Sequence, residues 1–363
     1  NQMYKFKTAF VTFFPIIPDN MGSSTVINSR FKNWPNKKKL FQISHIKNVD
    51  TNNIKTIFIK KETPLYKITN LPKLIFKIFN FLKDSKNSLI VIEGASWIFY
   101  SFIVLFSFKL LLPSSKILYL SHSVESEIRK KYSNILIFKL TKFLEKWVFK
   151  YADISTTVST IEQKKIMKLY NSKTILYPNA LTLDNKIKKQ TLFKDYIIYS
   201  GSYLYKPNKN AIDTLNDKIM PKLLEKFPNL KLVLTGGGFN KKLPWVINKG
   251  IVKKKDLYNL IYYSKCMCVP LKFGSGTRIK IIEAMAVGAI VVSTIKGIEG
   301  IDLKSKNPPF VTDNIKKIRH IITTVISKNK DLKKKSFKQR NYYFEKYSMK
   351  KNTENFIKQN IRF

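Results

Sequence analysis

The chain has 363 residues, enough for two domains that each bury a core of their own. Its hydrophobic content of 44%, with 26 Phe and 18 Tyr, excludes an intrinsically disordered chain. The formal net charge of +44 comes almost entirely from lysine, whereas proteins that read nucleic acids more often use the planar fork of arginine. The charge therefore favours nucleotides, which it would steer electrostatically, or anionic lipid headgroups over a nucleic acid.

The two cysteines, Cys266 and Cys268, alternate on an expected buried strand and lack C-x-x-C spacing. This pattern predicts neither a disulfide nor a zinc site, and it is typical of a reducing, cytosolic compartment. The opening residues do not have the charged, apolar and small-residue regions of a signal peptide.

Short apolar runs separated by turn residues predict strands in the first half of the chain, with helices between them. A turn loop that contains Gly22 follows the first strand and leads into a helix. The expected strands cover residues 4–14, 42–46, 56–60, 88–94 and 117–120.

Two helices of this half raise the question of a membrane. Residues 73–84 interleave lysines with phenylalanines, a pattern that suits either a membrane interface or a surface helix packed on the sheet. Within the segment 94–112, the uncharged run 94–108 is shorter than the ~20 residues of a spanning helix, and Lys109 interrupts the segment. We therefore expect a helix that is buried or dips into lipid, with a transmembrane anchor as the less favoured alternative.

A histidine follows the strand at 117–120. His122 would lie at the carboxyl edge of a parallel sheet, where such sheets bind ligands, although a histidine taken alone is more often structural. His45 and His320 have no comparable context.

The second half repeats the alternation after a lysine-rich, polar linker at 185–194. Its first strand ends at Gly201, and a second, at 231–238, ends in three glycines. Further on, we expect a helix at 256–263 and a terminal helix after residue 346.

The most informative segment is 270–301. It predicts a strand end, a loop of Gly274, Ser275 and Gly276, a helix over Ile279–Ala286, and a strand over Ala289–Val292. A loop of small residues that runs into a helix start exposes free N–H groups, which suit a phosphate.

One side of this helix carries both a cation and a carboxylate. Gly276, Lys280 and Glu283 share that side, with Glu283 roughly 10 Å along the axis from Gly276. This spacing fits a nucleotide diphosphate, with its phosphates near Arg278 and Lys280 and a ribose diol on Glu283. An ordinary amphipathic helix with a Lys280–Glu283 surface pair is the alternative.

The same segment resembles the donor-binding region of glycosyltransferase family 4, retaining enzymes of the two-lobed GT-B fold. The likeness rests on GTRIKIIEAMAVGAIVVST, which follows a branch with the pattern G-T-R-x-K-x-x-E-A-M-A. Further matches are HSVES from His122, ADISTTVS, LYPNALTLD, and a G-S-x-x-x-x-P-N-x-x-A pattern from Gly201.

The resemblance implies an α/β chain with two Rossmann-like lobes and a cleft between them. The lobes would span residues 1–188, which bind the acceptor, and 189–345, which bind the nucleotide sugar, and a helix at 346–363 would return to the first lobe. The implied catalytic residues are His122, Arg278, Lys280 and Glu283. The implied nucleotide-sugar contacts are Gly22 (equally readable as a plain turn glycine), Gly201, Gly250, Ile251, Ser275, Gly276, Thr277, Arg278, Lys280 and Glu283.

The chain departs from the family at two places. Many members hold the diphosphate with an arginine and a lysine where this chain has Ser202 and Pro207, so Arg278 and Lys280 would have to replace them. The first glutamate of the family's Glu-x7-Glu pattern falls on Ser275, which leaves the sugar open. The sequence has no Asp-x-Asp triplet, so we expect neither a metal nor a cofactor.

We therefore expect a hexosyltransferase-type enzyme that acts on a glycan or lipid-linked acceptor in polysaccharide or lipopolysaccharide-type biosynthesis. It would be cytoplasmic, with peripheral contact to the anionic cytoplasmic membrane face and no nucleic-acid partner. The alternatives are a basic nucleic-acid- or membrane-binding protein without catalysis, and a GT-B sugar-nucleotide epimerase.

Overall fold

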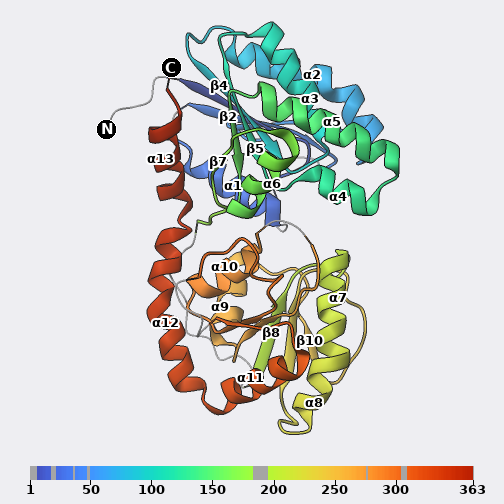
Figure 1. Cartoon of the computed structure of the whole chain (residues 1–363), viewed down its shortest axis with the longest axis vertical. Helices are drawn as coiled ribbons and strands as arrows, with labels where there is room; N and C mark the ends of the chain where they lie inside the picture. The colour runs from blue at the N-terminus through green and yellow to red at the C-terminus, as the bar shows by residue number, and fades with distance from the viewer. Residues whose placement is uncertain are drawn as a thin grey trace. The chain divides into compact units, whose positions relative to one another are not determined.

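The computed structural model describes residues 6–17, 22–35, 37–46, 50–182, 195–274, 277–303 and 309–362. The chain forms two compact units: unit 1 comprises Asn1–Ala180 and Met349–Phe363, and unit 2 comprises Leu181–Ser348 (Figure 1). The expected linker at 185–194 and the expected boundary at residue 188 lie outside the described residues.

Unit 1 is built on a seven-stranded parallel sheet with strand order β3-β2-β1-β4-β5-β6-β7. Its strands are β1 (Lys7–Thr12), β2 (Lys38–Ser44), β3 (Ile54–Phe58), β4 (Ser88–Gly94), β5 (Lys116–Ser121), β6 (Ile154–Thr157) and β7 (Ile175–Leu176). Its helices are α1 (Gly22–Asn33), α2 (Pro64–Leu82), α3 (Ile98–Leu111), α4 (Glu125–Tyr132), α5 (Ile135–Tyr151), α6 (Thr160–Tyr170) and α13 (Met349–Asn360).

Helices cover both faces of this sheet, which is why its central strands are apolar on both sides. Successive residues of β1 point to opposite faces: Val11 joins the core under α2, α3 and α5, whereas Phe10 joins the core under α1 and α13. The expected return of the terminal helix is confirmed, because α13 packs on α1 within unit 1.

Unit 2 has a six-stranded parallel sheet with strand order β10-β9-β8-β11-β12-β13. Its strands are β8 (Tyr196–Ser200), β9 (Lys231–Thr235), β10 (Val246–Asn248), β11 (Met267–Val269), β12 (Val291–Ser293) and β13 (Phe310–Val311). Its helices are α7 (Lys206–Thr214), the π-helical turn η1 (Leu215–Ile219), α8 (Met220–Leu224), α9 (Lys254–Tyr263), α10 (Ile279–Ala286), α11 (Ile315–Ser327) and α12 (Asn329–Lys346).

The predicted fold class, with two parallel Rossmann-like sheets, is confirmed. In unit 2 the strand order reverses between β8 and β11, and ligands of such sheets bind beyond the carboxyl ends of the strands at this point. Both cysteines are buried and free.

The two helices that raised the question of a membrane differ from their predicted bounds. α2 is longer than the expected 73–84, because Thr63 caps its N-terminus and Pro64 occupies the first turn. α3 packs one side on the sheet. Across the described ranges, no helix combines the length and apolar character needed to cross a bilayer.

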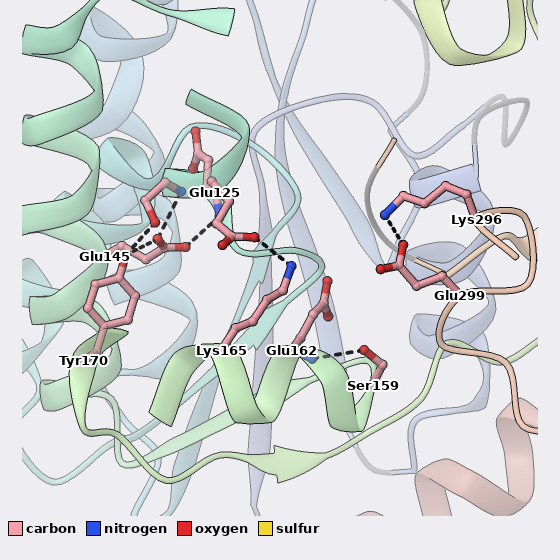
Figure 2. Close-up of polar contacts among 10 residues, drawn as sticks. Glu125, Glu145, Ser159, Glu162, Lys165, Tyr170, Lys296 and Glu299 are labelled. Carbon is pink, nitrogen blue, oxygen red and sulfur yellow. Dashed lines mark hydrogen bonds and ion pairs between the residues drawn. The ribbon is translucent and has the colours of Figure 1, made fainter. Parts of the chain in front are cut away.

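A buried carboxylate anchors the start of α4, directly after the strand that carries His122. Glu145 accepts the backbone N–H groups of Glu125, at 2.8 Å, and of Ser126, at 3.1 Å, while the Tyr170 hydroxyl donates to it at 2.6 Å (Figure 2). A carboxylate at a helix N-terminus satisfies free donors and the helix dipole together. This arrangement fixes the end of the short loop between β5 and α4.

Glu125 in turn holds the start of α3. One carboxylate oxygen accepts the backbone N–H of Ile98 at 2.6 Å, and the other accepts the Arg129 side chain at 3.0 Å. Burial outweighs these contacts and raises the pKa of Glu125 to about 7. In the folded protein this carboxyl therefore keeps its proton to a higher pH than in the unfolded chain.

This proton linkage predicts the behaviour of Glu125→Gln. Because the native pKa is raised, wild-type stability falls as pH increases from about 4.5 to about 7, where the buried side chain must become charged. Glutamine keeps an acceptor for Ile98 without the charge. Relative to wild type, Glu125→Gln should gain roughly 2–3 kcal/mol between pH 5 and pH 8.

Urea unfolding followed by tryptophan fluorescence measures this difference, since Trp34, Trp97 and Trp147 all lie in unit 1. Glu127→Gln, which alters an exposed carboxylate of the same helix, is the matched control. Identical pH dependence in wild type and Glu125→Gln would contradict the assignment.

Candidate functional site

The loops that follow β8, β9 and β10 meet at one edge of the unit 2 sheet. Gly201 donates its backbone N–H to Thr235, and Gly236 donates to the carbonyl of Gly250 at 2.7 Å. A Cβ atom on Gly236, whose φ is +110°, would lie 2.5 Å from the Gly201 backbone. The close approach of these loops therefore requires glycine there.

Gly250 and Ile251, two predicted contacts, lie at this edge. Gly250 has a φ of +60°, and its N–H donates to Asn248 at 3.0 Å. The Ile251 side chain is 67% exposed and lies beside Gly237. An exposed apolar side chain next to glycine loops offers a surface for a flat apolar group.

Lys280 connects α10 to the turn after β8. Its ammonium donates to the Tyr199 hydroxyl at 3.0 Å and to Asn208 Oδ1 at 2.9 Å, and it lies 4.2 Å from the centre of the Tyr199 ring. A Cβ atom on Gly201 would lie 2.6 Å from Lys280 Nζ. Sequence positions 201 and 280, both predicted site residues, are therefore in direct contact.

The surroundings of Lys280 lower the pKa of its ammonium group, so that it can gain or lose its proton near neutral pH. Burial and the nearby positive charge of Arg278 together lower its pKa to about 7, although Glu283 acts in the opposite direction. A lysine in this state holds its proton more firmly once an anion lies beside it.

The predicted phosphate loop, Gly274–Gly276, and the two residues after it precede α10. Ser275 and Gly276 lie outside the described residues. Arg278 directly precedes α10, and its guanidinium lies 2.9 Å from the position of a Cβ atom on Gly274. Among the described residues, the Thr277 hydroxyl is buried and has no hydrogen-bond partner. Such an oxygen is suited to an additional polar ligand.

Glu283 is buried and faces α9. Lys254 Nζ lies 2.6 Å from its carboxylate, and the Tyr258 hydroxyl donates to the same oxygen at 3.4 Å. The alternative of a Lys280–Glu283 surface pair is wrong, because each side chain has its own partners from other elements. Sequence reasoning missed Lys254, since nothing in the run Lys253–Lys255 distinguishes one lysine from the next.

In unit 1, His122 contacts a buried ion pair. Its Nε2 lies 2.7 Å from Glu93, and Arg30 Nη1 lies 2.7 Å and 2.6 Å from the two oxygens of that carboxylate. Burial acts to raise the pKa of Glu93, but the Arg30 charge and the His122 hydrogen bond outweigh it and hold the pKa below its ordinary value. Glu93 is therefore ionised, so the proton of a neutral His122 ring resides on Nε2 and Nδ1 is an acceptor.

The contacts continue from Arg30 to the terminal helix. The guanidinium lies 4.9 Å from the centre of the Tyr177 ring, whose hydroxyl bonds Thr353 at 2.7 Å. Sequence reasoning missed Glu93 and Arg30. The available signals were a single carboxylate within the apolar strand SLIVIEG and an arginine in a chain whose basic residues are mostly lysines.

Two further predictions stay untested. Gly22 forms the first residue of α1, and residues 18–21 before it are outside the described ranges. In the part of the chain that the structure describes, no group of three His, Cys, Asp or Glu side chains could hold a metal ion. Metal independence remains a prediction.

Comparisons with known proteins give a family likeness for part of the chain and a fold for most of it. Residues 194–327 match the family described as "Glycosyl transferases group 1". No match was found among curated proteins.

Solved structures resemble most of the chain. The structure of Anabaena HepE in complex with UDP and glucose covers 97% of this chain and 98% of its own, with a TM-score of 0.70 and 11% identity. A glycosyltransferase from Rickettsia africae covers 98% of both chains, with a TM-score of 0.64 and 14% identity.

TarM of S. aureus matches 80% of this chain, with a TM-score of 0.64 and 15% identity. The matched region is only 58% of the TarM chain. At these identities, the structural likeness establishes the fold alone. The chain therefore has the GT-B fold, and residues 194–327, within its second unit, are similar to the group 1 glycosyltransferases.

Proposed function

We propose that the protein is a retaining glycosyltransferase that moves a sugar from a nucleotide diphosphate sugar to a glycan or lipid-linked acceptor. The observation that carries this proposal is the contact between Lys280 and the glycine turn after β8, at the strand-order reversal of unit 2. The group 1 family match and the UDP and glucose bound by HepE support a nucleotide sugar as donor. We also propose the G-T-R-x-K-x-x-E-A-M-A branch for this chain.

The leaving diphosphate gains negative charge as the glycosidic bond breaks. Lys280, Arg278 and the free N–H groups at the start of α10 would stabilise that charge, in the manner of an oxyanion hole. Tyr199 and Asn208 hold the Lys280 ammonium in advance, so little reorganisation is needed. These fixed positive groups would make a metal unnecessary.

Glu283 would accept the two hydroxyls of the ribose. The ion pair with Lys254 fixes the position of its carboxylate, and a carboxylate accepts hydrogen bonds from a diol with both oxygens. The exposed apolar side chain of Ile251 would lie under the base. Gly201, Gly250 and Thr277 would line the same site, together with Ser275 and Gly276.

His122 would orient the donor sugar or stabilise its cation-like centre. Ionised Glu93 fixes the imidazole, and the acceptor at Nδ1 suits a sugar hydroxyl. Gly22, at the start of α1, would contact donor or acceptor. An epimerase would need no acceptor, and this separates the two activities.

A donor screen tests the proposal. Nucleotide sugars are incubated with the protein and a lipid-linked acceptor, and nucleotide release is measured with and without EDTA. We expect at least one donor to give nucleotide release that depends on the acceptor. EDTA should not change the rate of that release. Glu283→Ala should weaken donor binding about tenfold or more through loss of charged hydrogen bonds, and Arg278→Ala should mainly lower kcat.

Glu225→Ala, which removes an exposed carboxylate of the same unit, is the control. Release without an acceptor would favour the epimerase. Wild-type transfer rates in both Glu283→Ala and Arg278→Ala would refute the site.

The lowered pKa of Lys280 predicts a pH dependence of donor binding. A diphosphate favours the ammonium, which is lost as pH rises through about 7, so the dissociation constant should increase roughly ten- to thirty-fold from pH 6.5 to 8.5. Lys280→Arg stays charged and should bind with little pH dependence. Isothermal titration calorimetry measures both proteins, and equal pH profiles would exclude this role for Lys280.

Glu93→Gln tests the support of His122. The amide cannot hold the imidazole as an ionised acceptor does, so kcat should fall roughly ten- to a hundred-fold with a small change in the donor KM. The double variant with His122→Gln should be no slower than His122→Gln alone. Because Glu93→Gln leaves Arg30 buried without its carboxylate, Arg30→Met with Glu93→Gln serves as the folding control. If the losses in kcat from Glu93→Gln and His122→Gln were additive in the double variant, Glu93 would not act through His122.

A further inference from the structure

Three helices of unit 1 form one continuous outer layer. α3 packs against both α2 and α5, and the three lie together over one face of the sheet (Figure 1). We call their outward side the α2–α3–α5 face. Together the three helices hold 11 of the 21 large apolar side chains that are exposed in the described chain: Leu65, Tyr66, Phe76, Leu110, Leu111, Ile135, Leu136, Ile137, Leu140, Phe143 and Tyr151.

On α5 the exposed apolar side chains form a line. Leu136, Leu140, Phe143 and Tyr151 are exposed, Trp147 between them is half-buried, and the spacing of three or four residues places all five on one side of the helix. Leu136 is 73% exposed and Phe143 is 55% exposed. Trp147 stacks on Tyr151 with ring centres 5.1 Å apart, and Phe106 of α3 lies 5.5 Å from Tyr151. The apolar surface thus continues from α5 to α3.

Between α3 and α2 the surface is hollowed. An apolar groove of about 620 Å³ lies there, and Ser107 is the single polar residue of its lining. Phe76 and Phe79 of α2 form one wall, and Phe99 and Ile103 of α3 form the other. The groove joins the apolar surfaces of the two helices into one region.

Lysines border this region, and exposed acids are missing from the three helices. Lys139, Lys142 and Lys146 follow the apolar line of α5 at helical spacing, and Lys150 Nζ lies 5.5 Å from the Trp147 ring. Within the described residues of α2, α3 and α5 the one acidic residue is Glu145, which is buried and anchors α4. The face is therefore apolar at its centre and positively charged beside it.

We propose that the α2–α3–α5 face docks on the surface of an anionic lipid bilayer. The apolar line of α5 would enter the boundary between headgroups and acyl chains, with Trp147 and Tyr151 at the headgroup level and the lysines on anionic headgroups. The helices would lie in the plane of the interface. The proposal does not depend on sugar transfer, because the face itself supplies the affinity.

The charge and the apolar side chains of the face favour an anionic bilayer over a second copy of the chain or a nucleic acid. A second copy of the chain would bring the same lysines against this face, and like charges would oppose a two-fold dimer. A nucleic acid would satisfy the lysines but would leave the line of Leu136, Leu140 and Phe143 against phosphates. An anionic bilayer matches both the apolar centre and the positive charge.

Vesicle sedimentation with the full chain tests the proposal. We expect binding to vesicles of phosphatidylcholine and phosphatidylglycerol at 70:30, and at least tenfold weaker binding to phosphatidylcholine alone. Leu136→Ser with Leu140→Ser and Phe143→Ser should weaken binding at least tenfold. Lys139→Gln with Lys142→Gln and Lys146→Gln should do the same and reduce the salt dependence.

Two matched controls use exposed residues elsewhere. Ile161→Ser with Met167→Ser and Ile295→Ser changes three apolar side chains, and Lys218→Gln with Lys226→Gln and Lys317→Gln changes three lysines. Both should bind vesicles as wild type does. Circular dichroism of each variant verifies its fold.

Three results would overturn the proposal. The first is an absence of binding to anionic vesicles. The second is an equal loss in the α5 lysine variant and its control, since the net charge of the chain would then explain the binding. The third is a concentration-dependent dimer of the wild-type protein in light scattering that is lost when Leu136, Leu140 and Phe143 are replaced by serine, while that variant still binds vesicles as wild type does. That result would identify a second copy as the occupant.

Discussion

The buried ion pair between Arg30 and Glu93 is the interaction that holds the candidate site of unit 1 in place. Both side chains are almost completely buried, and each pays for its desolvation through the other. Arg30 belongs to α1, Glu93 lies near the end of β4, and His122 follows β5, so one helix and two neighbouring strands of the sheet meet at one carboxylate. Loss of one partner of such a pair costs roughly 3–5 kcal/mol.

Unit 2 uses a buried carboxylate in the same way at its own site. Glu283 lies inside α10 and is held by Lys254 of α9, much as Glu93 is held by Arg30. In unit 2 the cation holds Glu283 itself, the side chain that sequence reasoning identified, whereas in unit 1 it holds Glu93, which in turn holds the identified side chain, His122. The ligand-facing group is therefore positioned before any ligand binds.

The sequence predicted much of the fold, because apolar runs and glycine-bounded loops carry local information. The helix over Ile279–Ala286 was predicted at its observed bounds. The partners of its polar residues were not: Lys254 and Glu283 are 29 positions apart, and Arg30 and Glu93 are 63 apart. Periodicity assigns a residue to a face, but only packing selects which distant side chain meets it.

The same limit applies to α2 and to the lysines. Thr63 and Pro64 form a recognisable helix start, yet the apolar pattern used for prediction begins nine residues later. The large lysine surplus hides Lys254, whose contact with a carboxylate is not visible in a sequence. The sequence pattern identified Lys280 but could not show its burial.

The placement of α13 has a consequence for how the protein is made. Unit 1 is assembled from two separate pieces of chain, and unit 2 is an insertion between them. During synthesis, residues 1–180 emerge before unit 2, and Tyr177 and the core around Phe10 lack Thr353 and Phe356 until all of unit 2 has been translated. The first unit therefore passes through a long interval with one side of its sheet incompletely covered, in which chaperone binding would protect it from aggregation.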